Sequence, residues 1–136
     1  MGFLNGSVKH VLWTVMQETP TDPNNPFFAY LDALSDCTMY IGNAERFTPR
    51  PATYFRLVSP YDYGRACPQV PIYSYSFALN SSSHQPSGCL NMSAVDGAYL
   101  RLGMANTTDL LAVRTYGFAY NLLSIANGLA TLKFQQ

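Results

Sequence analysis

Three side chains that can take part in catalysis or metal binding lie close together in the stretch NSSSHQPSGCLN, namely His84, Ser87 and Cys89. A nucleophilic Ser or Cys needs a base, and the base needs a third group to orient it. Neighbours within one turn rarely reach that geometry, and the nearest carboxylate is Asp96. The other histidine, His10, is distant in the chain, so a zinc site is short of ligands. The sequence therefore predicts neither an enzyme nor a cofactor.

The same stretch is better explained as a rigid corner between two strands. A proline fixes φ at the start of a turn, and a glycine can adopt the positive φ that other residues resist. Ser and Asn side chains can bond to backbone groups that a sharp turn leaves unpaired, and a Gln can reach a neighbouring loop. We assign these structural roles to Gln85, Pro86, Ser87, Gly88, Asn91 and Ser93.

The composition points to a chain that contacts other proteins. Of 136 residues, 48% are hydrophobic and only 12% are charged, with eight basic and eight acidic residues. So few ions cannot coat a whole surface, and we expect part of it to face another protein; a monomer coated in Ser, Thr, Asn and Gln is the alternative. No Lys/Arg cluster exists, which argues against direct nucleic-acid binding. No apolar run reaches the length of a membrane span, and no signal-peptide core begins the chain.

The cysteines and the glycosylation sequons indicate no secretory pathway. Cys37, Cys67 and Cys89 are odd in number and form no CxxC motif, so reduced thiols are expected. Sequons occur at Asn5, Asn80, Asn91 and Asn106, which chance explains in a chain rich in Ser and Asn. Among them, Asn80 and Asn106 are kept as possible glycosylation sites.

Alternating apolar residues and turn signals predict strands joined by tight Asn/Gly turns and long proline-rich loops. In the run 72–80, the side chains of Tyr73, Tyr75, Phe77 and Leu79 are expected to face inward. Helix is expected only around 52–57 and as a short turn across 27–34. The expected strands cover residues 7–16, 37–41 with a Gly-Asn turn and a short strand into Phe47, 73–79, 90–104 with a bend at Asp96-Gly97, 110–125 and 129–134.

This spacing favours an all-β fold, a jelly-roll β-sandwich of two antiparallel sheets with Greek-key connections, in a single domain over residues 1–136. A full jelly roll has eight strands, and the count here is slightly short. Within such a sandwich, Trp13 is expected in the core. Arg101 and Arg114, on strands, are expected to pair with carboxylates or to cap a sheet edge. The arginines of the loops, Arg46, Arg50, Arg56 and Arg65, are expected to be solvated or to contact another subunit.

Several motifs resemble those of one protein family, the major capsid proteins of the nucleocytoplasmic large DNA viruses. The resemblance is carried first by Tyr75–Leu79, Gln85–Gly88, Asn91 with Ser93, and Val95-Asp96. Lys9 and Trp13 match a family strand near the start. Further matches, in the same order as in the family, are Arg46, Phe47, Tyr54, Phe55, Tyr120-Asn121, Leu123, Ile125, Gly128 and Leu132. Gly6-Ser7 and Ala94 depart from the family pattern, which affects surface details rather than the fold.

The resemblance implies a structural role in a virion. Family members carry two consecutive jelly rolls, and this chain is similar to the second, C-terminal one, with its first strand missing before Gly2. The implied partners are the chain itself, as a homotrimeric pseudo-hexagonal capsomer of an icosahedral shell, and neighbouring capsomers or minor capsid proteins. Assembly in the host cytoplasm and the absence of a cofactor are implied in the same way.

Two other functions share the architecture. A carbohydrate-binding, lectin-like jelly roll is the alternative, because tyrosines between residues 54 and 75 could stack on sugars; an acidic calcium cluster, which would support it, is missing from the sequence. A cupin-type enzyme comes third, since two histidines cannot supply its metal shell.

Overall fold

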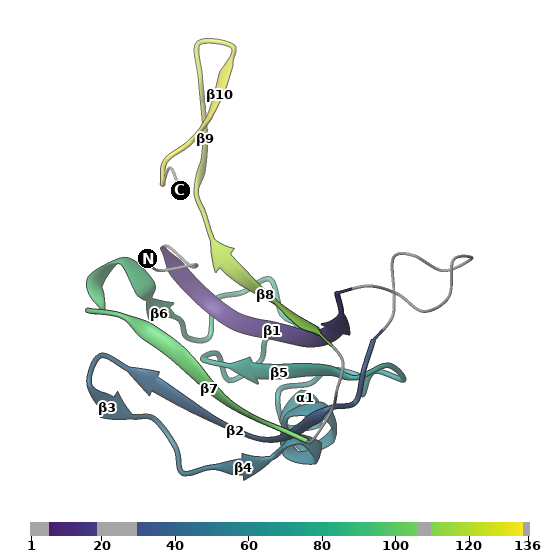
Figure 1. The fold of residues 1–136 in the computed structure, drawn as a ribbon. Helices are drawn as coiled ribbons and strands as arrows, with labels where there is room; N and C mark the ends of the chain where they lie inside the picture. Colours follow the sequence, from purple (N-terminus) through teal and green to yellow (C-terminus); the bar gives the residue numbers. More distant parts are fainter. Residues whose placement is uncertain (1–5, 19–29, 106–109, 135–136) are drawn as a thin grey trace.

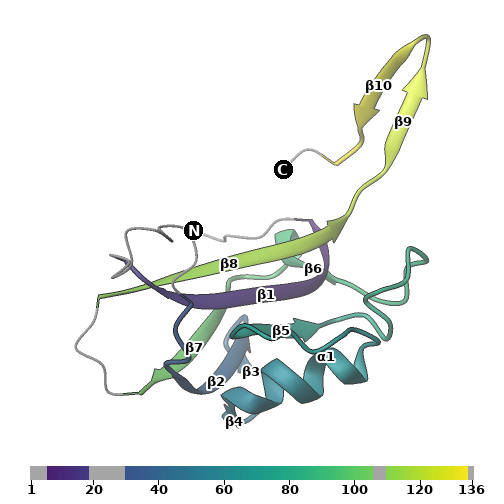
Figure 2. The ribbon, with the colours of Figure 1, turned by 90° about the vertical axis from the view of Figure 1, so that its right-hand side faces the viewer.

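A computed structural model of the chain describes residues 6–18, 30–105 and 110–134 (Figure 1). Most strands form two antiparallel sheets, and a separate two-stranded hairpin extends away from them. Figure 2 shows the sheets from the side, with the helical segment next to β5. The predicted all-β architecture of two antiparallel sheets is confirmed.

The first sheet, which we call the β1 sheet, is built around β1 (Ser7–Gln17). β8 (Leu111–Tyr120) pairs with β1 along its whole length. Because β8 occupies one edge of β1, the two shorter strands β5 (Ile72–Ser76) and β6 (Leu90–Asn91) share the opposite edge. Valine, threonine and tryptophan side chains favour this pleated surface, and the strand predicted over 7–16 is confirmed.

The second sheet, the β2 sheet, repeats this plan around β2 (Leu34–Ile41). β7 (Ala98–Met104) covers one edge of β2, and the short strands β3 (Ala44–Glu45) and β4 (Arg50–Pro51) share the other. A two-residue turn at Gly42-Asn43 joins β2 to β3, with Gly42 at a φ of 60°. The hairpin predicted from the Gly-Asn pair is thus confirmed.

The apolar core lies between the two sheets. Val11 and Trp13 of β1 and Tyr73 and Tyr75 of β5 supply one side of it, and Cys37 and Met39 of β2 supply the other. Trp13 is fully buried, with its ring centroid 5.4 Å from that of Phe55. The prediction that Trp13 is a core residue is therefore confirmed.

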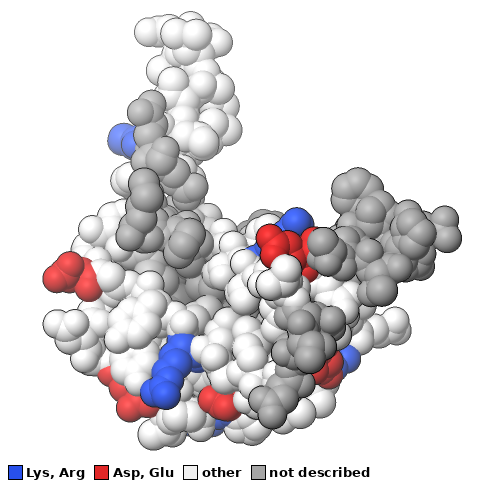
Figure 3. Space-filling view, viewed as in Figure 1, with Lys and Arg blue, Asp and Glu red and all other residues white. Residues whose placement is uncertain are grey.

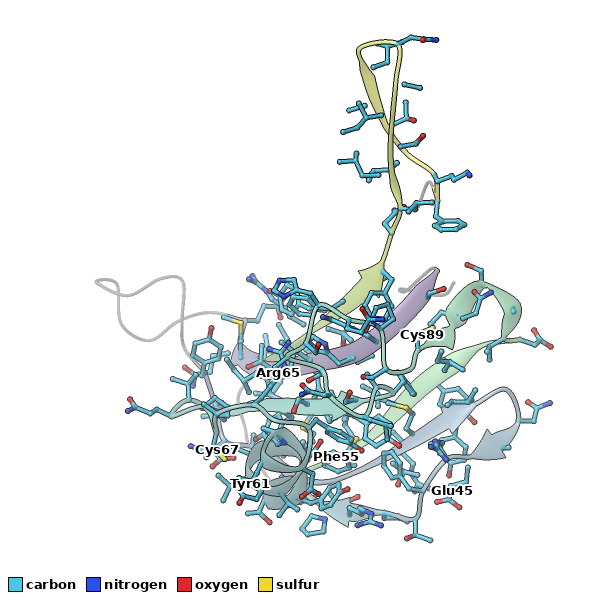
Figure 4. The ribbon with its side chains drawn as sticks, turned by 180° about the vertical axis from the view of Figure 1, so that it is seen from behind. Glu45, Phe55, Tyr61, Arg65, Cys67 and Cys89 are labelled. Carbon is cyan, nitrogen blue, oxygen red and sulfur yellow. The ribbon has the colours of Figure 1, made fainter. Side chains whose placement is uncertain are left out.

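One helical segment follows β4 and contributes Phe55 to the core (Figure 4). It has a wide π turn over Tyr54–Val58 (η1) and an α turn over Ser59–Asp62 (α1), so it extends beyond the predicted 52–57. Pro60 has no amide hydrogen and disfavours a regular helix before it. The wide turn accommodates this break, because the Ser59 amide donates to the carbonyl of Tyr54, five residues back.

The hairpin that leaves the sheets consists of β9 (Leu123–Ala126) and β10 (Leu129–Leu132), joined by Asn127-Gly128. We call residues 122–134 the arm. It follows β8 directly, and Figures 1 and 2 show it projecting away from both sheets. The predicted turn at Asn127-Gly128 is confirmed, with φ of 53° and 77° at its two residues.

Two strand predictions and one burial prediction are wrong. The strand expected over 90–104 is two strands in different sheets, because a short 3-10 turn (Met92–Ala94) and Gly97 redirect the chain between β6 and β7. The strand expected over 110–125 is interrupted at residues 121–122. Leu79 does not face inward: β5 ends at Ser76, and the Leu79 side chain is 83% exposed.

The helical turn expected across 27–34 falls partly outside the described residues. Its described part is not helical, since Leu34 already begins β2 and Tyr30 forms an isolated bridge with Met16.

Candidate functional site

The corner between β5 and β6 is held by bonds between its polar side chains and its own backbone. The Ser87 hydroxyl accepts from the backbone N–H of Asn80 at 3.0 Å and donates to the backbone carbonyl of Asn80 at 3.2 Å. The Asn80 side-chain oxygen accepts in turn from the amides of Ser82 and Ser83. The Gln85 side chain forms no hydrogen bond with a described residue. The backbone N–H of Gln85 donates to the Ser83 hydroxyl.

Gly88 stands where the corner passes against the end of β5. Its φ is 142°, and a Cβ placed there would lie 2.7 Å from the carbonyl oxygen of Phe77. That separation is too short for a carbon and a backbone oxygen, so a side chain at this position forces the two segments apart.

A second group of polar contacts joins the corner to the start of β1. The Ser93 hydroxyl accepts from the Gly6 amide at 2.9 Å, and the Met92 amide donates to the Gly6 carbonyl at 2.9 Å. The Asn91 side chain caps the 3-10 turn by accepting from the Ser93 amide. These bonds fix where the chain enters the β1 sheet.

The potential nucleophiles and ligands of the corner are not assembled for chemistry. The Ser87 hydroxyl is used by Asn80, and His84 and Cys89 are exposed. In the described part of the chain, no three His, Cys, Asp or Glu side chains gather where they could hold a metal ion. The cysteines are free thiols, and burial raises the pKa of the Cys37 thiol to about 12, which makes it unreactive.

His10 is a buried residue that was not predicted to belong to the core. Its ring is 1% exposed and stacks on Phe118 of β8 with centroids 4.2 Å apart, and neither ring nitrogen has a hydrogen-bond partner among the described residues. Burial, assisted by the nearby cations of Arg65 and Lys9, lowers the pKa of His10 to about 4. His10 is therefore a neutral packing residue at ordinary pH.

Two loop arginines are structural rather than free. Arg65 donates to the hydroxyl of Ser81 at 2.8 Å and to its carbonyl at 3.0 Å, which joins the segment after α1 to the corner (Figure 4). Arg56 pairs with Asp32 at 2.9 Å, and Asp32 also accepts from the Tyr73 hydroxyl at 2.8 Å. Both therefore bind within the chain, a role that the sequence did not predict, and contact of either with another subunit stays a prediction.

Arg101 and Arg114 lie on β7 and β8, which pair only with β2 and β1 among the described strands. Both therefore stand on sheet edges, as one of the two predicted roles requires. Neither forms an ion pair with a described residue, so pairing with a carboxylate is not observed there.

The outer face of the β1 sheet has an apolar hollow of about 210 Å³. Leu12 and Met16 of β1, Ile72 of β5 and Tyr116 of β8 line it, and Arg114 is the one charged side chain among its described lining residues. Figure 3 shows that charged side chains are sparse over the face in view, with wide uncharged areas between them. Such surfaces suit contact with another protein better than catalysis.

A family model that describes the major capsid protein of large eukaryotic DNA viruses matches residues 4–131. The chain belongs to this family. The major capsid protein of Phaeocystis pouchetii virus is 39% identical over 100 residues, which cover 71% of this chain and 19% of the relative. That of Chrysochromulina ericina virus is also 39% identical over 100 residues, which cover 71% and 17%. The chain thus spans less than a fifth of the length of these relatives.

Solved structures of viral capsid proteins share the fold. VP54 of PBCV-1, fitted into a reconstruction of the virophage Sputnik, gives a TM-score of 0.77 at 22% identity, over 98% of this chain and 44% of that chain. The Faustovirus major capsid protein gives 0.62 at 12% identity, over 85% and 30%. The jelly-roll class predicted from the sequence is confirmed by these neighbours.

Membership in a family of structural capsid proteins also confirms that the chain is not an enzyme. None of the described helices is long and apolar enough to cross a lipid bilayer. Of the two possible glycosylation sites, Asn80 is exposed and Asn106 lies outside the described residues. Sugar attachment at either remains a prediction.

Proposed function

We propose that this chain forms part of the wall of an icosahedral viral capsid, in pseudo-hexagonal capsomers built from three copies. The observation that carries the proposal is the family match over residues 4–131, together with the shared two-sheet fold. Neighbouring capsomers and minor capsid proteins are its further partners, and the virion, assembled in the host cytoplasm, is its location.

The physical properties of the domain suit a wall. A core of interlocked aromatic rings between two sheets resists deformation. The corner residues Gln85 to Gly88, with Asn91 and Ser93, serve as architecture that sets the path between strands, not as a reaction centre. In the longer proteins of the family, the domain corresponds to the second of two jelly rolls.

Cryo-electron microscopy of particles from cells that produce the chain tests this function. Density for the fold is expected in the shell at positions related by local three-fold axes. Immunolabelling of intact and disrupted particles provides the control for placement. Purified particles that lack the chain, or that carry it only inside the shell, would contradict the proposal.

A further inference from the structure

The arm has one wholly apolar face. In the β9–β10 pairing, Leu132 is opposite Leu123 and Ala130 is opposite Ile125, so these four side chains share one face. The other face carries Ser124 opposite Thr131 and Ala126 opposite Leu129. On the apolar face, Leu123 is 57% exposed, Ile125 72% and Leu132 56%.

The arm is an ordered element rather than a frayed end. Asn121 closes its base: the side-chain amide donates to the Phe134 carbonyl at 2.7 Å, and the side-chain oxygen accepts from the amides of Leu122 and Phe134. The Asn127-Gly128 turn closes its tip with the positive φ values that a two-residue hairpin requires. An isolated hairpin is marginal in water, so a preformed apolar face implies a surface that covers it.

The hollow on the β1 sheet offers an apolar surface of similar character, and it does not lie at the end of β8 from which the arm leaves. Arg114 and Tyr116, which line the hollow, lie near the middle of β8, whereas the arm continues from Tyr120 and points away from both sheets (Figures 1 and 2). The arm of one chain therefore leads away from its own hollow.

The low charge of both surfaces also favours a contact between the arm and the hollow. No acidic or basic residue occurs between Arg114 and Lys133, so the arm brings no charge to a contact. Among the described residues that line the hollow, Arg114 is the one charged side chain, and the others are apolar or carry a hydroxyl. An uncharged arm can cover the apolar part of the hollow without bringing a second ion next to Arg114.

We propose that the apolar face of the arm binds in the β1-sheet hollow of a second copy of this chain. The inference rests on the proposed function, in which copies of one chain stand side by side. The contact joins two different patches, so it is heterologous, and successive copies close into a ring where the rotation allows. The arm is then the part that links one subunit to the next.

Sedimentation velocity of purified chains over a range of concentrations tests the contact with matched variants. Ile125→Asp places a charge on the apolar face, and Leu129→Asp places the same charge on the opposite face at nearly equal exposure, 72% against 71%. Ile125→Asp is expected to weaken self-association at least about tenfold, while Leu129→Asp leaves it nearly unchanged. Trp13 fluorescence and the melting temperature confirm that each variant is folded.

A mixing experiment tests which two patches meet. Tyr116→Asp places a charge in the hollow and Ile125→Asp places one on the arm, so each variant alone is expected to self-associate at least about tenfold more weakly than the wild type. Mixed together, they retain one intact arm and one intact hollow, and heterodimers are expected.

Equal weakening by Ile125→Asp and Leu129→Asp, or failure of the mixture to associate, would overturn the contact. A wild-type chain that stays monomeric at every concentration would overturn it too. The proposed function is decided separately, by the particles: a chain found in the shell whose arm variants assemble normally disproves the contact alone.

Discussion

At the scale of single residues, the polar side chains of this domain bond mainly to its own backbone. Ser87, Ser93 and Asn91 each bind main-chain groups within or beside the corner. This explains why a cluster of His, Ser, Cys and Asn that resembles a reactive site in sequence has no reactive geometry. The corner is sensitive to backbone changes for the same reason.

Replacement of Gly88 by alanine is expected to lower the free energy of unfolding by about 1–3 kcal/mol, because φ is 142° and a Cβ meets the Phe77 carbonyl at 2.7 Å. Gly97→Ala is the matched control, since φ is 84° there but nothing lies within 4 Å of the added carbon. Chemical denaturation measures both. Equal losses would show that the close approach to Phe77 is not the cause.

His10 is expected to make stability depend on pH. Its pKa is about 4 in the folded chain, below the ordinary 6.5, so between these values the unfolded chain binds more protons. The free energy of unfolding should therefore fall as the pH falls from about 6.5 towards 4, by at most about 1.4 kcal/mol per pH unit. The stability that is lost when His10 takes up a proton is fully present above about pH 6.5.

His10→Phe keeps a ring to stack on Phe118 and removes the titration, so thermal melting across this pH range should depend less on pH than in the wild type. His84→Gln, at an exposed histidine, is the control and should follow the wild type. A His10→Phe profile parallel to the wild type would contradict the assignment.

At the scale of elements, strands and hairpins were predictable where a clear sequence pattern lay within a few consecutive residues. β1 and the Gly42-Asn43 and Asn127-Gly128 hairpins follow from alternation and two-residue turns, which are local signals. The break at residues 121–122 does not, because both flanks are apolar and the Asn121 contacts with Phe134 are distant in sequence.

Tertiary contacts explain the remaining misses. The separation of β6 from β7 depends on bonds between residues 91–93 and Gly6, far away in the chain. The burial of His10 depends on Phe118, which is 108 positions later in the sequence printed above, a pairing that only the β1–β8 register supplies. Neither the separation of β6 from β7 nor the burial of His10 can be predicted from a short stretch of sequence.

Asn121→Ala is expected to loosen the arm without unfolding the sheets. It removes the hydrogen bonds to Leu122 and Phe134, each worth about 1 kcal/mol. Amide hydrogen exchange should accelerate in β9 and β10 and stay unchanged in β1. Asn121→Asp keeps the acceptor and loses the donor, so an intermediate rate is expected; acceleration in β1 as well would show that the arm supports the sheets.

At the scale of the whole molecule, the small number of charged residues affects which interactions can hold copies of the chain together. Eight basic and eight acidic residues are spread over the chain, and large apolar side chains are exposed on both β8 and the arm. Contacts between copies, as proposed above, are therefore expected to depend on apolar burial rather than on ion pairs.

Self-association is accordingly expected to persist when NaCl is raised from about 0.1 M to 1 M, conditions in which ionic contacts between surfaces are screened. Light scattering at fixed protein concentration measures this. The Arg56–Asp32 pair, which lies within the chain, serves as an internal reference, because Asp32→Asn should leave the dependence unchanged. Dissociation by salt would indicate an ionic interface instead.

In both sheets the two edges of the central strand are covered differently, and this asymmetry affects misassembly. Each central strand has one margin made of two short pieces, β5 with β6 or β3 with β4, and one margin made of a single long strand, β8 or β7. A fragmented margin cannot template a long foreign strand, whereas a continuous one can. Uncontrolled polymerisation, where it occurs, should therefore propagate from β7 and β8, and charges placed there should suppress it most effectively.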